Sequence, residues 1–315
     1  MKRGRLVVLR ILLLLCALAL SGCSTQTSES AGADISVRVV ATQSFGQELM
    51  FDETLEVPPG TSAMEALDRV ADVETAYGGG FVKAINGVRS GGAKGDWFIC
   101  VNGIRTNVGA LDYTLRDGDI QRWDIHDWRF RMFIPAVVGD FPEPFLHGYG
   151  GKVYPTVIVY EDGLEEIARD LESSLQGLGV VDVSAERMSD LGESERQHSN
   201  LILVGTLDCS LVSQLNQPWD RLGFFIHFED GVMVVYNSKG EAVAECGPGS
   251  GVIQATQSPW NPDGVGACEN VVWIVSGTDE AGVKSAMDAL INRHDGFQYA
   301  CAVVVADGEI IKVPQ

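Results

Sequence analysis

The hydrophobic pattern changes near residue 150, and this change constrains the fold more than any other feature of the sequence. Before it, short segments of alternating apolar and polar residues are separated by tight-turn dipeptides such as Asn86-Gly87 and Asn102-Gly103. After it, continuous apolar runs, beginning with residues 156–160, are followed by segments with apolar residues at helical spacing. The pattern therefore predicts two cores of different class, a small α+β domain and then an α/β domain.

Residues 34–132 show the order strand, strand, helix and then short strands. The helix is expected over 62–70, where Ala63, Ala66, Leu67 and Val70 recur at helical spacing behind a hydroxyl side chain suited to capping. Alternation and turn dipeptides predict strands at 35–39, 49–57, 81–85, 97–101 and 120–125. This order is typical of a β-grasp domain, in which a small mixed sheet folds over one helix.

Residues 133–151 are interpreted as a linker, because they contain Pro135, Pro142, Pro144 and several glycines. A further strand is considered at 127–133. Residues 152–315 are predicted to form an open α/β sheet with helices on its faces. The expected strands lie at 156–160, 180–183, 201–205, 271–275 and 302–305, the helices at 164–175, 207–215 and 282–291, and a hairpin at 224–236.

Two strands of this second domain end in similar loops, at Gly205-Thr206 and Gly277-Thr278. Ligands of open α/β sheets tend to bind at the carboxyl ends of strands, so we expect these loops to be paired along one sheet edge. Neither loop has a complete nucleotide-binding motif. Residues 200–205 and 276–279 resemble α/β modules of prokaryotic surface-layer proteins, and this resemblance implies no particular site.

The first 23 residues combine a basic start, a short apolar run and small residues, which is the order of a secretory signal. The apolar run at 11–20 is too short to span a bilayer as a conventional helix. Leu20-Ser21-Gly22-Cys23 resembles the lipobox of bacterial lipoproteins, which implies a lipidated Cys23; the alternative is a plain cleaved signal. Residues 24–33 are then a flexible tether. We expect the protein at the cell membrane, lipid-anchored and facing outside the cytoplasm.

Charge and cysteine content narrow the classes of function further. Asp and Glu total 43 against 23 Lys and Arg, which disfavours a nucleic-acid partner. Cys246 and Cys268 flank a loop rich in Gly, Pro and Ser and are the best candidates for a disulfide; the alternative is a set of buried thiols. Neither metal-ligand spacing nor a catalytic motif stands out, so we expect no enzyme, no metal site and no catalytic cofactor.

Four motifs of the first domain look like the DUF4430 family, the transcobalamin-like C-terminal domain. They lie at 81–88, 96–103, 108–113 and 115–120. Members of this family resemble the β-domain of the vitamin B12 carriers, which covers one face of a bound corrin while an α/α toroid supplies the other face. Nothing in this sequence resembles the toroid. The resemblance implies a corrinoid ligand, cobalamin or a relative of it.

A corrinoid site needs a broad apolar platform with a few polar groups. The first domain offers aromatic and amide side chains for this purpose, and the candidate ligand-binding residues are Tyr77, Trp97, Asn102, Asn107, Tyr113 and Trp128. The alternative is that strand aromatics belong to the core and that Asn-Gly pairs only shape turns. His126 is able to ligate cobalt through a neutral imidazole, although we expect it to be a surface histidine.

These features lead to one leading hypothesis of function and one competitor. The leading hypothesis is a lipoprotein that binds a corrinoid between its two domains, the α/β domain replacing the toroid, and delivers it to a membrane importer. The competing hypothesis is a non-catalytic surface interaction or scaffold protein that binds protein or glycan.

Overall fold

The computed structural model describes residues 33–92 and 95–315. The predicted signal peptide, the predicted lipidation site Cys23 and all but the last residue of the predicted tether lie outside these residues. Within them, Asp34–Gln315 form one compact unit. None of the described helices is both long and apolar enough to cross a membrane.

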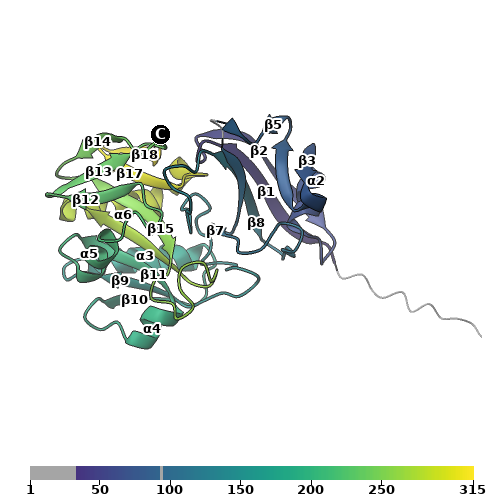
Figure 1. Ribbon diagram of the computed structural model, residues 1–315. Coiled ribbons are helices and arrows are strands. Elements are labelled where there is room, and N and C mark those ends of the chain that lie inside the picture. Colours follow the sequence, from purple (N-terminus) through teal and green to yellow (C-terminus); the bar gives the residue numbers. More distant parts are fainter. Residues whose placement is uncertain (1–32, 93–94) are drawn as a thin grey trace, which may run out of the picture. The chain divides into compact units, whose positions relative to one another are not determined.

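Within the described residues, the N-terminal part contains a five-stranded mixed sheet (Figure 1). Its order is β2-β1-β8-β6-β7, with β1 parallel to β8 and antiparallel to β2. The strands are β1 Ile35–Gln43, β2 Glu48–Val57, β6 Asp96–Val101, β7 Ile104–Arg105 and β8 Ile120–His126. A small three-stranded sheet joins β3 Val73–Ala76, β4 Phe81–Ile85 and β5 Val88–Arg89, with a 3₁₀ turn at Tyr77–Gly79.

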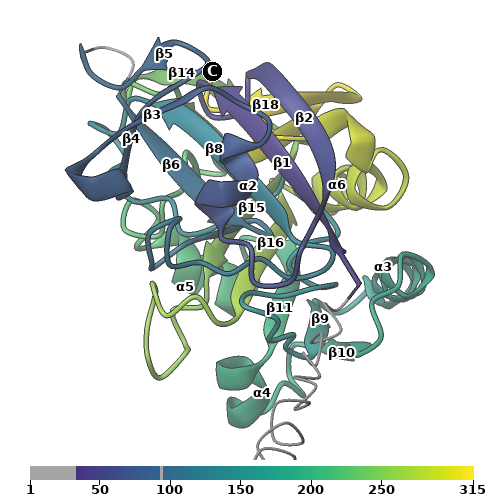
Figure 2. The ribbon, with the colours of Figure 1, turned by 90° about the vertical axis from the view of Figure 1, so that its right-hand side faces the viewer.

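Helix α2, Ala63–Asp68, covers one face of the five-stranded sheet (Figure 2). A capping box starts it: the Ser62 hydroxyl accepts from the Glu65 amide, and the Glu65 carboxylate accepts from the Ser62 amide at 2.7 Å. Its buried side chains, Leu67 among them, share a core with Val39 and Trp123. The predicted arrangement, a mixed sheet over a helix near 62–70, is therefore present.

The C-terminal part contains a seven-stranded sheet within the described residues, in the order β10-β9-β11-β16-β15-β17-β18. β10, β9, β11 and β16 run parallel to one another, and β15, β17 and β18 join through antiparallel pairs. The bounds are β9 Thr156–Tyr160, β10 Val183–Arg187, β11 Asn200–Thr206, β15 Gly251–Gln257, β16 Val271–Gly277, β17 Ala302–Ala306 and β18 Glu309–Val313.

Both faces of this sheet are covered. α3 Glu165–Gly177 and α6 Glu280–Asn292 pack on one face. α5 Ser210–Asn216 and the sheet of β12 Ile226–Glu229, β13 Val232–Tyr236 and β14 Ala242–Cys246 lie on the other. The short α4, Glu193–His198, precedes β11, and a 3₁₀ helix spans His294–Phe297. The structure is thus of mixed α and β content, with several sheets and few helices.

Two predicted strands differ from the structure, and a central strand of the second part was missed. The strand expected at 180–183 begins only at Val183, and the strand considered at 127–133 is absent. β15 was missed because Gly251, Gln254 and Thr256 interrupt its apolar pattern. All residues of β15 are nevertheless buried, since the strand is paired on both sides by β16 and β17.

The two similar strand ends are neighbours, as predicted, because Thr206 is in register with Gly277. The polar groups at these strand ends form hydrogen bonds within the protein. The Glu161 carboxylate accepts from the Thr206 amide at 2.9 Å, and Asp279 caps α6 by accepting from the Gly282 amide at 2.8 Å. These contacts indicate a structural use for this sheet edge.

The segment 134–140 is a packed strap between the two large sheets, in contrast to the predicted flexible linker. On one side the Arg105 amide donates to the Pro135 carbonyl at 3.0 Å; on the other the Gly139 amide donates to the Ala300 carbonyl at 2.9 Å. Val138 is fully buried. The prolines led to the prediction of a linker. They are compatible with a packed strap, because residues outside a central strand tolerate the loss of an N–H donor.

His147, just beyond the strap, provides a test of stability against pH. The Glu143 carboxylate accepts from the His147 amide at 3.0 Å and contacts the ring nitrogen Nδ1. The hydrogen bond between Nδ1 of His147 and the Glu143 carboxylate raises the pKa of His147 above its usual value, although burial opposes this shift. A histidine with a raised pKa in the folded state stabilises fully below its unfolded pKa, about 6.5, and loses that contribution as pH rises through the folded pKa.

We therefore expect the free energy of unfolding lost by His147→Gln to be largest near pH 6 and to shrink as the pH rises. The loss should stay below about 1 kcal/mol, because the ring is over a third exposed to solvent. Urea unfolding of both proteins across this pH range measures it, with the exposed His198→Gln as control. A loss of His147→Gln that is the same at every pH would contradict the assignment.

Candidate functional site

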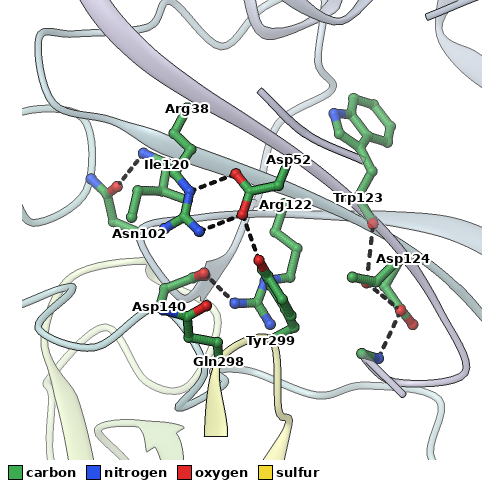
Figure 3. Close-up of polar contacts among 12 residues, drawn as sticks. Arg38, Asp52, Asn102, Ile120, Arg122, Trp123, Asp124, Asp140, Gln298 and Tyr299 are labelled. Carbon is green, nitrogen blue, oxygen red and sulfur yellow. Dashed lines mark hydrogen bonds and ion pairs between the residues drawn. The ribbon is translucent and has the colours of Figure 1, made fainter. Parts of the chain in front are cut away.

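The second face of the five-stranded sheet contacts the strap and the segment 299–301 (Figure 3). Arg38 donates from Nε to the Asp52 carboxylate at 2.7 Å, and the Tyr299 hydroxyl donates to the same carboxylate at 2.6 Å. The guanidinium of Arg38 holds the pKa of Asp52 below its usual value. Close by, Arg122 forms a buried ion pair with Asp140 of the strap. The two sheets are therefore joined by polar contacts as well as by apolar packing.

The turn between β1 and β2 is strained and is held by one carboxylate. Ser44, Phe45 and Gly46 all have positive φ angles, of 55°, 62° and 81°. At Gly46 a Cβ atom would lie 1.8 Å from the Tyr299 carbonyl oxygen, so this position requires glycine. Asp124 accepts from the Phe45 amide and the Gly46 amide, each at 3.0 Å. These bonds fix the ring of Phe45 against β8.

The ring of Phe45 packs on His126, the last residue of β8. Phe45 and Phe98 stack on opposite sides of the imidazole, each with 4.3 Å between ring centroids. The Nδ1 atom of His126 lies 2.6 Å from Oδ1 of Asp124, and the side chain is 8% exposed. An ionised carboxylate only accepts hydrogen bonds, so Nδ1 is the donor in this contact; in the neutral imidazole the lone pair is then on Nε2. No hydrogen-bond partner of Nε2 is found among residues 33–92 and 95–315.

His126 and Phe45 line a groove of about 420 Å³, a volume within the usual range for small-molecule sites. The remaining lining residues are Gln43, Ser44, Glu48, Ile125, Asp127, Arg129, Ser238 and Lys239. An adjoining hollow, also of about 420 Å³, shares Asp127, Arg129, Ser238 and Lys239 and adds Phe130. We call these two volumes together the seam groove, because the loop of Ser238 and Lys239 belongs to the C-terminal part of the chain.

The chemistry of the seam groove is that of a binding site. Arg129 is bound to Asp127 by Nε at 2.8 Å, so its charge is largely compensated. His126 offers a ring nitrogen fixed in orientation by the carboxylate of Asp124, an arrangement that orients histidines at metal centres. Among the described residues, no group of three or more His, Cys, Asp or Glu side chains could hold a free metal ion. A metal ion that is already bound by most of its ligands within a complex needs only one further ligand from the protein.

Three of the six predicted ligand-binding residues are buried and unavailable. Asn102 is fully buried, donates to Asp119 at 2.8 Å and to the Gly148 carbonyl at 2.7 Å, and accepts from the Ile120 amide. Trp97 lies in the core and donates to the Val88 carbonyl, while the Tyr113 hydroxyl accepts from the Gly150 amide. Burial in the core under α2 makes Trp97 and Tyr113 unavailable to a ligand, and internal hydrogen bonds do the same for the buried Asn102.

The other three predicted residues are accessible. Tyr77 is 91% exposed, and Asn107 is exposed and accepts from the Tyr149 hydroxyl; neither lines the seam groove. Trp128 is half-buried, donates to Asp96, and stands in the chain between two groove residues, Asp127 and Arg129.

The expectation that His126 is a surface residue was wrong. Side chains alternate between the faces of a strand, so Arg122, Asp124 and His126 share one face of β8. Three polar side chains in alternation at the end of an otherwise apolar strand were the available signal. The sequence did not reveal the partner surface that buries them.

The predicted disulfide is not formed. Cys246 and Cys268 are both free thiols in the structure. The chain between them is the central strand β15 and a following loop, not a single surface loop. Cys246 ends β14, whereas the Cys268 thiol donates to the Arg105 carbonyl at 3.0 Å.

Comparisons with known proteins agree with the sequence resemblance over part of the chain. Residues 60–126 match the model of DUF4430, a domain of unknown function. This confirms the recognition of that domain inside the predicted range 34–132. No curated protein matches the chain.

Two solved structures are similar over 30% of this chain, both at 18% identity. One is a candidate metal-binding protein from Ruminococcus gnavus, with a TM-score of 0.24 and 98% of that chain covered. The other is haptocorrin in complex with Cbi, with a TM-score of 0.25 and 25% of that chain covered.

Proposed function

We propose that this protein binds a corrinoid in the seam groove, with Nε2 of His126 as an axial ligand of the cobalt. The protein acts as a lipid-anchored carrier outside the cytoplasm and delivers the corrinoid to a membrane importer. The observation that carries the proposal is the fixed orientation of His126, whose Nδ1 contacts the Asp124 carboxylate while its ring is stacked between two phenylalanines.

The geometry of His126 suits a macrocyclic metal complex better than a free ion. A corrin ring would itself supply four nitrogen ligands to cobalt, so a single imidazole would be enough as the ligand from the protein. Neutral imidazole is a suitable ligand for such a metal. The carboxylate of Asp124 orients the ring, as carboxylates behind ligating histidines do at metal sites. The ligand class comes from the resemblance of the first domain to the β-domain of the vitamin B12 carriers, in the region where residues 60–126 match DUF4430.

The seam groove also fits the rim of such a ligand. Phe45 and Ile125 offer apolar surface, while Gln43, Ser44 and Ser238 offer hydrogen bonds for peripheral amides. Lys239 brings a cation that could contact a nucleotide phosphate. A corrinoid larger than the groove would remain partly exposed to solvent, a suitable state for a ligand that is later handed on.

Titration of residues 34–315 with cobinamide and with cobalamin tests the proposal. Cobinamide lacks a nucleotide base and leaves an axial position open to the protein, so we expect saturable binding accompanied by a change in the visible spectrum. Tyr77→Ala and Asn107→Ala, whose residues lie outside the groove, should leave the titration unchanged. Absence of heat and of spectral change with both corrinoids at micromolar protein would overturn the proposal.

The second candidate function, a surface interaction or scaffold role, is favoured by one observation. Tyr77 is 91% exposed and packs edge-on against Phe81, and a Cβ atom at the nearby Gly79 would lie 3.3 Å from the exposed Leu111. Contiguous exposed apolar side chains often mark binding surfaces. Specific binding of protein or glycan that Tyr77→Ala removes, in a protein inert to corrinoids, would favour this role.

A further inference from the structure

The two Asn-Gly dipeptides of the chain lie in opposite environments. Asn86-Gly87 forms the two-residue turn between β4 and β5, and both residues have positive φ angles, of 48° and 79°. Both are exposed, and a Cβ atom at Gly87 would have no neighbour within 4 Å. Asn102-Gly103 joins β6 to β7 in the same way, but Asn102 is fully buried. The same dipeptide can therefore be compared in two settings within one molecule.

The chemistry open to an asparagine before glycine is deamidation, and asparagine is among the thermolabile side chains. The backbone nitrogen of the glycine bonds to the carbonyl carbon of the asparagine side chain, and its proton passes through solvent to the side-chain nitrogen. That nitrogen leaves as ammonia, and a five-membered succinimide ring remains. Water then opens the ring at either carbonyl and gives aspartate or isoaspartate. Glycine favours the attack because it has no side chain to obstruct it.

The surroundings of Asn86 favour this reaction. The Asp72 amide donates to Oδ1 of Asn86 at 2.9 Å. A donor in this position stabilises the negative charge that develops on the oxygen during the attack, as in an oxyanion hole. Among residues 33–92 and 95–315, neither the leaving nitrogen Nδ2 of Asn86 nor the attacking amide of Gly87 has a hydrogen-bond partner. Both nitrogens that react are therefore unengaged within the described part of the chain.

The surroundings of Asn102 oppose the same reaction. Although the Ile120 amide donates to its Oδ1 at 2.8 Å, its Nδ2 donates to Asp119 at 2.8 Å and to the Gly148 carbonyl at 2.7 Å. The leaving nitrogen thus has both of its protons engaged, and water does not reach the side chain. Opening three buried hydrogen bonds first should slow the reaction by on the order of 100-fold.

We propose that Asn86 is a site of spontaneous deamidation in the folded protein, whereas the fold protects Asn102. The product changes the hairpin, because isoaspartate adds one carbon to the backbone of a two-residue turn whose flanking residues, Ile85 and Val88, are paired. The Val88 carbonyl accepts from Nε1 of Trp97 at 3.1 Å, so the change reaches a side chain of the core under α2. This inference does not depend on what the seam groove binds.

Ageing of residues 34–315 in mildly alkaline buffer made with heavy-oxygen water tests the proposal. Trypsin cleaves after lysine and arginine, so Asn86 is recovered in peptide 84–89 and Asn102 in peptide 95–105. We expect peptide 84–89 to exchange its amide for a carboxylate that contains heavy oxygen, and to separate into aspartate and isoaspartate forms. Peptide 95–105 should react on the order of 100-fold more slowly.

Two controls separate the effect of the fold from that of the dipeptide. In urea both peptides should react at similar rates, because the hydrogen bonds of Asn102 are then open. Asn86→Ser should remove the fast reaction and leave the slow reaction of Asn102. Equal rates of the two peptides in the folded protein, or a reaction of peptide 84–89 in urea alone, would overturn the proposal.

Discussion

Replacing His126 with phenylalanine should abolish the spectral change that cobinamide binding produces. Phenylalanine keeps a ring between Phe45 and Phe98, so the stack and the fold are expected to persist. Asp124 retains three donors, from Thr42, Phe45 and Gly46. The variant loses the nitrogen ligand and the contact of Nδ1 with Asp124. The measurement is a visible titration, with the unfolding midpoint confirming that the variant is folded.

Two related variants sharpen this test. Asp124→Asn leaves His126 in place but removes the carboxylate that fixes its proton, and should weaken corrinoid affinity by about 10–100-fold. His126→Ala opens space beside the phenylalanines, and added imidazole should restore the spectral change. The exposed His198→Ala is the control. An unchanged titration of His126→Phe would show that no cobalt–imidazole bond forms.

Replacing Asp140 with alanine should cost about 3–5 kcal/mol of the free energy of unfolding. The side chains of Arg122 and Asp140 are 4% and 2% exposed, so the variant leaves a guanidinium buried without its countercharge. Asp140 belongs to the strap between the sheets, and the loss is therefore expected for the whole compact unit. Urea unfolding followed by tryptophan fluorescence measures it.

The control for Asp140→Ala is Glu74→Ala, which breaks an ion pair with Arg89 in which both side chains are about half exposed. Its cost should be below about 1 kcal/mol. The double variant Arg122→Met/Asp140→Leu removes both charges and should be much more stable than Asp140→Ala alone. Similar losses for Asp140→Ala and Glu74→Ala would contradict a buried, uncompensated charge.

Local signals predicted much of the fold. The capping residues of α2, the Asn-Gly turns and the long apolar runs of β9, β11 and β16 act over a few residues, and their elements formed where expected. β15 depends on long-range burial instead. Its Gln254 and Thr256 are buried because neighbouring strands from distant parts of the chain surround them, which no local pattern indicates.

The candidate site was harder to predict for the same reason. Aromatic and amide content identified Trp97 and Asn102, but Trp97 packs in the first core and Asn102 is buried in hydrogen bonds to Asp119 and the Gly148 carbonyl. His126 was noticed for its chemistry and then assigned to the surface. Phe45 packs on His126 from a strained turn. This turn is held by the hydrogen bond of the Phe45 amide to Asp124, and its Gly46 lies close to the Tyr299 backbone.

The strap has a consequence for how the N-terminal sheet can be transferred or studied. Residues 134–140 hydrogen-bond to β7 on one side and to 299–301 on the other, and the face that carries Arg38, Phe98 and Arg122 is covered only in the intact chain. A region that matches a family over 67 residues is thus not an autonomous physical module here. Grafted onto another protein, it would need a substitute cover for that face to remain soluble and folded.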